Sequence, residues 1–458
     1  MPLHFRTNQF VLRIIPKPFL LVIPAFISAA TGLAQEPWSL EQCISYAMEN
    51  NIELKQHRLT VQIEENNLRL SRLSAFPTLN ASANLRYTFQ HAQELLDEDE
   101  TGELEATTFA LNSSVTLFEG FRIANTRRQS HFNLLATISD VEKLRNDLSL
   151  NIASAYLQIL YSEEIVETAQ QQVNLSALQV ERTRTMVQAG SLPQGNLHEI
   201  EAQLASDQLQ LVNARNHRSI AYLSLTQLLD LRELDSIPIV KPNLENIVFM
   251  LPTNSSSHIY AQAVEIMPQI KSANLRVASR EKGLRIAKGR HYPRLLLTSG
   301  YNTGSRRYLG TNPQLMDDPF LTQVHLNANS FIRLSLSIPI FNSYQTRTAV
   351  SNALINLDHA RLDLELEQRA LYKEIQQAHS DAAAAHKKYE ATLKNLSALE
   401  LAFQHTEQKY ILGLLTSFDY STSKTRLATA QAELISAKYE FIFKTKILDF
   451  YKGIPLSL

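Results

Sequence analysis

The sequence predicts a mostly helical protein with a small amount of β structure, built from two copies of one unit. The segment Val115–Phe121 returns as Ile338–Tyr344, and Gly190 returns as Gly413, in both cases 223 residues later. Only 12 of the 458 residues are glycine, which is typical of helical chains. Long helical runs stand between short stretches of alternating polar and apolar residues. Such a unit favours an object that bridges two environments over a compact catalytic domain.

Each copy is expected to contain a helix, two strands, a very long helix, a turn and a return helix. The first copy covers 35–231, the second covers 258–458, and a linker rich in proline and serine joins them at 232–257. In the first copy we predict helix 38–75, strands 78–90 and 108–118, and helices 120–188 and 196–231. In the second we predict helix 258–291, strands 294–302 and 330–340, and helices 342–411 and 418–452.

Residues 1–34 are typical of an export signal peptide. Arg6, Arg13 and Lys17 precede an apolar stretch, and small residues follow as far as Ala34. The apolar stretch is too short for a retained membrane helix, which needs about 20 residues. Because no later segment approaches that length without charges, we expect an exported chain to meet a membrane only with strands.

Composition and motifs argue against several functions. The chain has 44 Lys and Arg against 45 Asp and Glu, so its net charge of −1 offers no basic field for nucleic acid. Cys43 is the only cysteine, which rules out an internal disulfide and suits a small buried helix residue. The sequence has no HExxH motif, no Gly-rich phosphate loop, no GxSxG motif and no Cys/His metal spacing. We therefore expect no catalytic, cofactor or metal site.

The longest helices carry a heptad pattern. Seven of the eight residues at every seventh position from Ile138 to Val187 are apolar and β-branched, and the second copy keeps the phase from Ile375 to Tyr410. At ~1.5 Å per residue such a helix is roughly 100 Å long, which approaches the width of a cell-envelope compartment. An ordinary coiled-coil rod fits the helices equally well, so the strands decide between the two interpretations.

The strands separate an apolar face from a polar face. Strands of about 9–11 residues that are apolar outside and polar inside are what a membrane barrel requires, although a hairpin half-buried on the helices would alternate in the same way. Two hairpins cannot close a barrel, because small barrels need about eight strands, so a barrel would be shared between chains. Leu295–Leu297 fits either face. The predicted lipid-facing residues are Leu79, Ala81, Ala83, Leu85, Tyr87, Phe89, Phe109, Leu111, Val115, Leu117, Ile332, Leu334, Leu336, Ile338 and Ile340.

The predicted loop 91–107 is strongly acidic. Its carboxylates lack the regular spacing of a calcium-binding loop. We therefore interpret it as a solvated loop beyond the membrane, with a calcium site as the alternative.

Together these elements resemble the TolC-type outer-membrane efflux family. The opening Trp38–Ala47 and the long helix into Pro77 are similar to the family's first helix, and the turns around Gly190 and Gly413 are similar to its periplasmic hairpins. The resemblance covers the whole mature chain and rests on the duplicated order of elements. It implies a homotrimer in the outer membrane of a Gram-negative-type bacterium. Four strands per chain would build a shared twelve-stranded β-barrel, and the helices would build a long periplasmic α-barrel.

The resemblance further implies a passive exit duct that performs no chemistry. The duct would be coupled to an inner-membrane pump through a periplasmic adaptor protein and would contact outer-membrane lipid. A soluble periplasmic coiled-coil scaffold or adaptor is the alternative function. Recovery with outer membranes would support the duct, whereas release by osmotic shock would support the scaffold. The sequence does not indicate the transported substrate.

A constriction at the tips is also implied by the resemblance. The family often has an acidic residue six positions after the turn glycine of the second repeat, which is Asp419 here; the counterpart in the first repeat is Asn196. The family also tends to have a second acidic residue one turn later, where this chain has Thr422. An arginine is common in the family two residues after the second-repeat glycine, where this chain has Leu415. These departures predict a weaker constriction with one ring of three Asp419 carboxylates. A cap for the return helix is the alternative role of Asp419.

The two tips supply the candidates for the adaptor contact. These residues are small or apolar, and they are Gly190, Ser191, Leu192, Gly413, Leu414 and Leu415. Leucines exposed at a turn are unexpected unless something covers them. Mutual packing of neighbouring tips is the alternative explanation.

Overall fold

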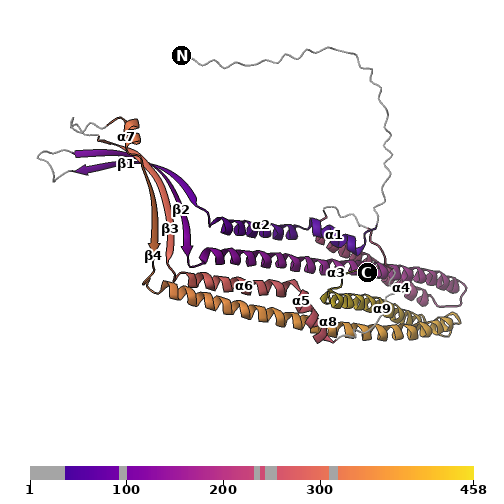
Figure 1. Ribbon diagram of the computed structural model, residues 1–458. Coiled ribbons are helices and arrows are strands. Elements are labelled where there is room, and N and C mark those ends of the chain that lie inside the picture. The colour runs from indigo at the N-terminus through magenta and orange to yellow at the C-terminus, as the bar shows by residue number, and fades with distance from the viewer. Residues whose placement is uncertain (1–36, 92–100, 232–237, 243–254, 309–317, 458) are drawn as a thin grey trace, which may run out of the picture.

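The computed structural model of the protein describes residues 37–91, 101–231, 238–242, 255–308 and 318–457. A sheet stands at one end of the molecule, and long helices run from it, side by side, to two helical tips at the other end (Figure 1). The predicted signal peptide at 1–34 lies outside the described residues.

Both halves of the chain supply helices, two strands and a long helical hairpin. The first half contains α1 (Leu40–Asn50), α2 (Ile52–Leu73), β1 (Thr78–His91), β2 (Thr101–Glu119), α3 (Arg122–Gln188) and α4 (Gln194–Leu228). The second half contains α5 (Ser256–Ile266), α6 (Pro268–Gly289), β3 (Arg294–Tyr308), α7 (Phe320–Leu326), β4 (Asn329–Ser337), α8 (Gln345–Ile411) and α9 (Ser417–Tyr451).

The first predicted helix of each half is divided in the structure. Helix 38–75 is broken at Asn51, whose side-chain oxygen accepts a hydrogen bond from the backbone N–H of Leu54 and so caps α2. Helix 258–291 is broken at Met267, because Pro268 has no N–H to continue α5 but suits the first position of α6. The sequence analysis predicted one helix in each of these places, and the structure has two.

The four strands form one antiparallel sheet in the order β1-β2-β3-β4. β1 and β2 remain paired as far as His91 and Thr101, so β2 begins earlier than the predicted 108. β3 is longer than the predicted 294–302, because it stays paired with β2 as far as Tyr308. Of the predicted acidic loop, residues 101–107 belong to β2, and 92–100 lie outside the described residues.

β4 is shorter than the predicted strand 330–340. It pairs with β3 from Asn329 to Ser337, and the chain then leaves the sheet. Ile338 and Ile340 were predicted as lipid-facing strand residues but lie beyond the strand, where both are exposed. Pro339 explains the difference, because it has no backbone N–H with which to continue the ladder.

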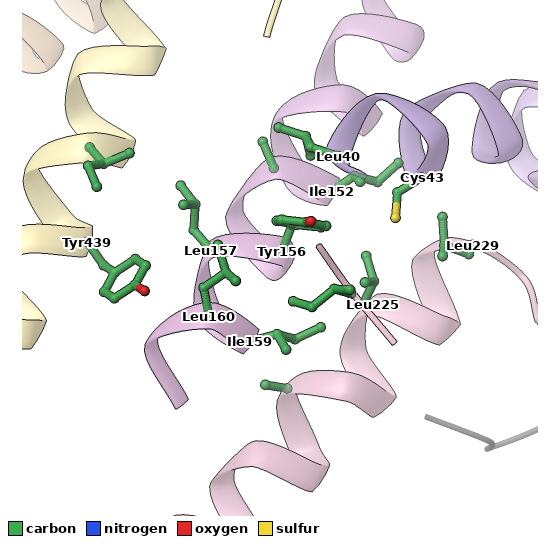
Figure 2. Close-up of a cluster of buried hydrophobic side chains, with 14 of the residues drawn as sticks. Leu40, Cys43, Ile152, Tyr156, Leu157, Ile159, Leu160, Leu225, Leu229 and Tyr439 are labelled. Atoms are coloured by element: carbon green, nitrogen blue, oxygen red, sulfur yellow. The ribbon is translucent and has the colours of Figure 1, made fainter. Parts of the chain in front are cut away.

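The two longest helices pack against most of the others. α3 packs against α2, α4, α6 and α9, and α8 packs against α5, α6 and α9. Figure 2 shows the core around the middle of α3, where Tyr156 lies among apolar side chains of α1, α3 and α4. The Tyr156 hydroxyl donates to the backbone carbonyls of Trp38 and Val240, at 3.1 and 2.7 Å. This residue therefore holds the start of the described chain and the inter-repeat linker against α3.

Cys43 belongs to the same core and is completely buried. The expectation of a small buried helix residue is confirmed. Burial raises the pKa of its thiol to about 12, so the thiol stays protonated at neutral pH.

The chain turns sharply where strands meet the long helices. Gly120 and Phe121 before α3 have φ of 54° and 60°, and the two residues before α8 have φ of 50° and 61°. The rings of Phe118 and Phe121 meet edge to face with centroids 5.5 Å apart, and Phe341 and Tyr344 make the same contact at 6.2 Å. The repeated sequence segment thus has a repeated backbone turn.

Candidate functional site

One face of the sheet is mainly apolar. Residues paired across antiparallel strands point to the same side, so the register places Ala81, Leu111 and Tyr301 together. This is the face that the sequence analysis assigned to lipid, and the register adds Leu295 and Leu297, whose side had been left open. The apolar residues of this face are Leu79, Ala81, Ala83, Leu85, Tyr87, Phe89, Phe109, Leu111, Val115, Leu295, Leu297, Tyr301, Ile332, Leu334 and Leu336.

A β-bulge interrupts this alternation where β2 approaches the helices. The register shifts between Thr116 and Phe118, which leaves Leu117 without a partner on β3. Leu117 was predicted as a member of the regular lipid-facing row and is instead the exposed bulge residue. After the bulge, Phe118 takes the side of Leu295.

The opposite face of the sheet carries amides, hydroxyls and arginines. Asn80 lies opposite Asn112, and Arg86, Arg306 and Arg333 share this face. The Arg333 guanidinium lies 5.3 Å from the centre of the Phe331 ring on the same strand. Such a polar face suits a water-filled lumen.

Both edges of the sheet and of the helical wall lack partners within the described chain. β1 pairs only with β2, and β4 pairs only with β3. On the same two sides, α2 leaves Ile63 and Leu70 exposed, and α8 leaves Leu362 and Leu366 exposed. α2 ends and α8 begins beside the sheet (Figure 1), and α8 also exposes Leu354 and Ile355, which lie nearer the sheet than Leu362 and Leu366.

Each helical tip ends in the same glycine turn. Gly190 and Gly413 both have φ of 73°. At the first tip the N–H groups of Gly190 and Ser191 bond to the carbonyl oxygens of Val187 and Met186, and the second tip repeats both bonds. This arrangement is a Schellman motif, which satisfies the last carbonyls of the helix and needs a residue that tolerates the left-handed conformation.

The candidate adaptor-contact residues differ in exposure. Leu414 is exposed, whereas Leu192 and Leu415 are half-buried, and Leu415 packs on the core beneath the second tip. No atom lies within 4 Å of the position that a Cβ would take at Gly190 or Gly413. Leu412 and Phe418, which are close to Leu414 in the sequence, are exposed as well.

Asp419 takes part in a capping box at the start of α9. Thr416 is the N-cap, and its hydroxyl accepts a hydrogen bond from the N–H of Asp419 at 3.1 Å. The Asp419 carboxylate in turn accepts from the N–H of Thr416 at 3.3 Å. Asp419 therefore contributes to the cap of α9 as the third helical residue, and Thr416 is the N-cap. Thr422 follows on the next turn of α9, whereas Asn196 lies in the first turn of α4, in the other hairpin.

A buried ion pair joins the two hairpins. Lys424 of α9 donates to the Asp207 carboxylate of α4 at 2.8 Å, and the two side chains are only 5% and 7% exposed. The Ser176 hydroxyl of α3 bonds to both side chains, and the carbonyl of Gln172 accepts from Lys424 at 3.2 Å. Gln203 donates to the second carboxylate oxygen at 2.8 Å. The sequence analysis missed this cluster.

An aromatic cluster lies nearer the tips. The rings of Tyr410 and Tyr420 stack with centroids 4.8 Å apart, packed on Val180 and Ile200 of the other hairpin. Burial raises the pKa of Tyr420 to about 12, so its hydroxyl stays neutral at physiological pH. Tyr420 precedes Lys424 by one helical turn, so both buried side chains lie on the same face of α9.

Comparison with known proteins identifies the family. The family model described as "Outer membrane efflux protein" matches residues 43–230 and 259–442, most of both halves. The chain belongs to the outer membrane efflux protein family. This efflux protein is similar to outer membrane protein TolC of Vibrio cholerae, with 22% identity over 431 residues and 92% of each chain covered. It is also similar to cation efflux system protein CusC of Escherichia coli O157:H7, with 23% identity over 439 residues, covering 93% of this chain and 89% of CusC.

Solved structures of efflux channels share the fold. A crystal structure of CusC superposes with a TM-score of 0.78 at 19% identity, covering 91% of this chain and 92% of that one. The CmeC outer membrane channel of Campylobacter jejuni superposes with a TM-score of 0.76 at 19% identity, covering 90% and 85%. The predicted fold class of long helices with a few strands is confirmed.

Family membership decides between the functions considered above. The outer membrane efflux protein is a channel component of the outer membrane, with its helical part in the periplasm, and is neither an enzyme nor a soluble scaffold. Among the helices that the structure describes, none combines the length and apolar character needed to cross a membrane. The described residues also contain no group of three or more His, Cys, Asp or Glu side chains placed to hold a metal ion.

Proposed function

We propose that this efflux protein is the exit duct of a tripartite system and is assembled from three copies of the chain. The match between its unpaired edges carries this proposal. A head-to-tail contact would place β4 of one copy beside β1 of the next, and α8 beside α2, and would repeat until a ring closes. Three four-stranded sheets contribute twelve strands, which exceeds the roughly eight that a small barrel needs.

The distribution of aromatic residues supports a membrane position for the sheet. Phe76 precedes β1, Phe121 follows β2, Tyr292 precedes β3 and Phe341 follows β4, and all four side chains are exposed. Outer-membrane barrels carry aromatic girdles at their interfaces with water. This ring of aromatics therefore marks the level at which the duct leaves the lipid for the periplasm. The apolar face above it would contact lipid, and the polar face would line the lumen.

The tips are the proposed docking surface for a periplasmic adaptor protein. Leu412, Leu414 and Phe418 are exposed at the end farthest from the sheet. An adaptor seated on these side chains would remove them from water and connect the duct to an inner-membrane pump. Contacts between neighbouring tips of the trimer would also cover them, and the Gly413 variants below distinguish the two arrangements.

Reconstitution into planar lipid bilayers tests the duct directly. We expect stepwise single-channel currents from a species whose native mass is that of three chains. Heating in sodium dodecyl sulfate should convert this species to a band with the mass of a single chain. The substitution Leu366→Asp on the free face of α8 should prevent trimer formation by burying a carboxylate at the contact. A monomeric wild-type protein that conducts no current would refute the proposal.

A bulky charge at the second tip should abolish export. In the variant Gly413→Arg the long side chain would project from a turn with open space around it, into the surface assigned to the adaptor. The control Gly413→Asn keeps a small residue that tolerates φ of 73°. We expect Gly413→Arg to assemble trimers but to lose adaptor co-purification and export, while Gly413→Asn keeps both. Normal export by the arginine variant would remove the tip from the docking surface.

A constriction formed by Asn196, Asp419 and Thr422 is proposed at the tips, and a substitution of Asp419 tests it. If its carboxylates form a ring at the periplasmic end, Asp419→Ala should raise single-channel conductance in planar bilayers. Because the substitution also opens the capping box, at a cost of about 1 kcal/mol, Thr416→Ala serves as the control that opens the box and keeps the charge. Equal conductance changes in both variants would assign the effect to helix capping instead.

A further inference from the structure

α7 lies across the outer end of the sheet, on its apolar face. The Thr303 hydroxyl donates to the backbone carbonyl of Val324 in α7, and the register puts Thr303 on the same face as Phe109. The rings of Phe320 and Phe109 meet edge to face with centroids 6.5 Å apart. In Figure 1 this helix is seen at the end of the sheet farthest from the long helices. α7 therefore packs on the outside of the proposed barrel and not in its lumen.

Two side-chain amides hold α7 to the part of β3 that β4 does not reach. β4 pairs with β3 only as far as Asn302. Beyond it, Gln323 accepts from the N–H of Arg306 at 2.8 Å and donates to its carbonyl at 2.9 Å, and Asn327 donates to the carbonyl of Gly304 at 2.8 Å. These bonds replace the ladder that a longer β4 would make. The position of the helix on the sheet is thus fixed by several contacts.

The side of α7 that faces away from the sheet exposes two leucines together with Thr322 and His325. Leu321 is 78% exposed and Leu326 is 66% exposed. Beside the helix, the apolar face is hollowed, because Ala81 and Ala83 stand where the rest of their row carries leucine, tyrosine and phenylalanine. The hollow has a volume of about 410 Å³ and is lined mainly by Ala81, Ala83, Phe109, Leu111 and Tyr301. Phe109 borders both the hollow and α7.

The distance along β3 places α7 at the boundary of the membrane. Thr303 follows Arg294 by nine residues, which at ~3.4 Å per residue and a strand tilt of ~40° is roughly 23 Å along the barrel axis. The apolar band of an outer-membrane barrel is about 25 Å tall. α7 is therefore at the level of the outer leaflet, on the side opposite the aromatic girdle near the helices.

We propose that α7 and the adjoining hollow form a lipid-binding site in the outer leaflet, a proposal that rests on the barrel described above. One acyl chain of a membrane lipid occupies the hollow at Ala81 and Ala83, and Leu321 and Leu326 insert among neighbouring chains. An acyl chain is the occupant because the hollow is continuous with the lipid-facing strands. A helix of this amphipathic kind at the membrane boundary buries its apolar side chains in lipid in preference to water. α7 thereby anchors the outer rim of the duct in the membrane.

Fluorescence quenching by brominated lipid tests this site. The only tryptophan, Trp38, lies against Tyr46 in the helical part, so Trp38→Phe gives a background without tryptophan emission. Leu321→Trp is introduced on α7, and Ile332→Trp on the middle of β4 serves as the matched control. Trimers are reconstituted into phosphatidylcholine vesicles whose acyl chains are brominated either near the glycerol or at mid-chain. We expect the Leu321→Trp emission to be quenched severalfold more by bromine near the glycerol, and the Ile332→Trp emission more by mid-chain bromine.

The outcomes separate this proposal from the barrel. If Ile332→Trp is quenched by brominated lipid and Leu321→Trp is quenched only by aqueous iodide, the barrel stands and the lipid site falls. The lipid site also falls if neither reagent quenches Leu321→Trp, because a neighbouring subunit then covers α7. If neither tryptophan is quenched by brominated lipid, the barrel itself is refuted.

A second variant tests the hollow. Ala83→Phe fills the space with a ring of the kind already present at Phe109 and leaves the backbone ladder unchanged. With phosphatidylcholine that carries a photoreactive group in its acyl chain, we expect labelling of the β1–β3 peptides to fall severalfold in trimers of this variant. Unchanged labelling would show that no acyl chain occupies the hollow.

Discussion

The substitution Lys424→Met is expected to loosen the contact between the two helical hairpins by about 3–5 kcal/mol, because it leaves the Asp207 carboxylate buried without its counter-charge. Ser176 and Gln203 would still donate hydrogen bonds to that carboxylate, but neither carries a positive charge. The loss should appear as faster amide hydrogen exchange in α4 and α9 around the pair, with little change near the sheet.

Two further variants isolate the cause of this effect. The double variant Lys424→Met with Asp207→Leu removes both charges and should restore slow exchange, since a buried pair can be replaced by apolar residues at little cost. Lys438→Met removes the partly exposed pair with Glu164 of α3, which also joins the two hairpins, and should cost about 0–1 kcal/mol. Equal exchange rates in the Lys424 and Lys438 single variants would contradict the importance of burial.

The substitution Gly120→Ala is expected to prevent assembly of the protein. Gly120 has φ of 54°, and a Cβ at this position would lie 2.2 Å from the backbone carbonyl oxygen of Gly289. The left-handed backbone alone costs roughly 1–2 kcal/mol in an L-residue, and the clash with another backbone adds to it because α6 cannot move without leaving α3. Trimer yield in outer-membrane fractions measures the result.

Gly190→Ala is the matched control for this prediction. Gly190 also has a positive φ, of 73°, but nothing lies within 4 Å of its Cβ position. The control therefore carries the backbone strain without the close contact, and we expect it to assemble with a modest loss of stability. If both variants assembled equally well, assembly would not require the close approach of Gly120 to Gly289.

The features that could be predicted from the sequence are those that depend on neighbouring residues in the chain. Glycine in a left-handed turn is readable at Gly190 and Gly413 because helices stop and restart around it, and the alternation from Thr78 onward directly reports a two-faced strand. Register is different, because it depends on which residues of another strand lie opposite. The bulge at Leu117 and the side taken by Leu297 could therefore be resolved only with the strands paired.

The features that sequence reasoning missed are contacts between distant segments. Lys424 and Asp207 are 217 residues apart, and each alone resembles a solvated helix residue. The sequence analysis did not predict α7, because its seven residues are too few for a helical period and its place is set by Gln323 and Asn327 on the edge of β3. In both cases the partner, and not the residue itself, determines the role.

The unpaired strands β1 and β4 have implications for how the protein reaches its destination. An isolated chain would carry two rows of unsatisfied backbone groups, which cost several kcal/mol each in hydrocarbon and promote aggregation in water. A single copy with unpaired strand edges is therefore unfavourable both in the hydrocarbon of the bilayer and in water. Cellular yield should accordingly depend on escort by chaperones and on coupling insertion to subunit association, more than on the intrinsic stability of one polypeptide.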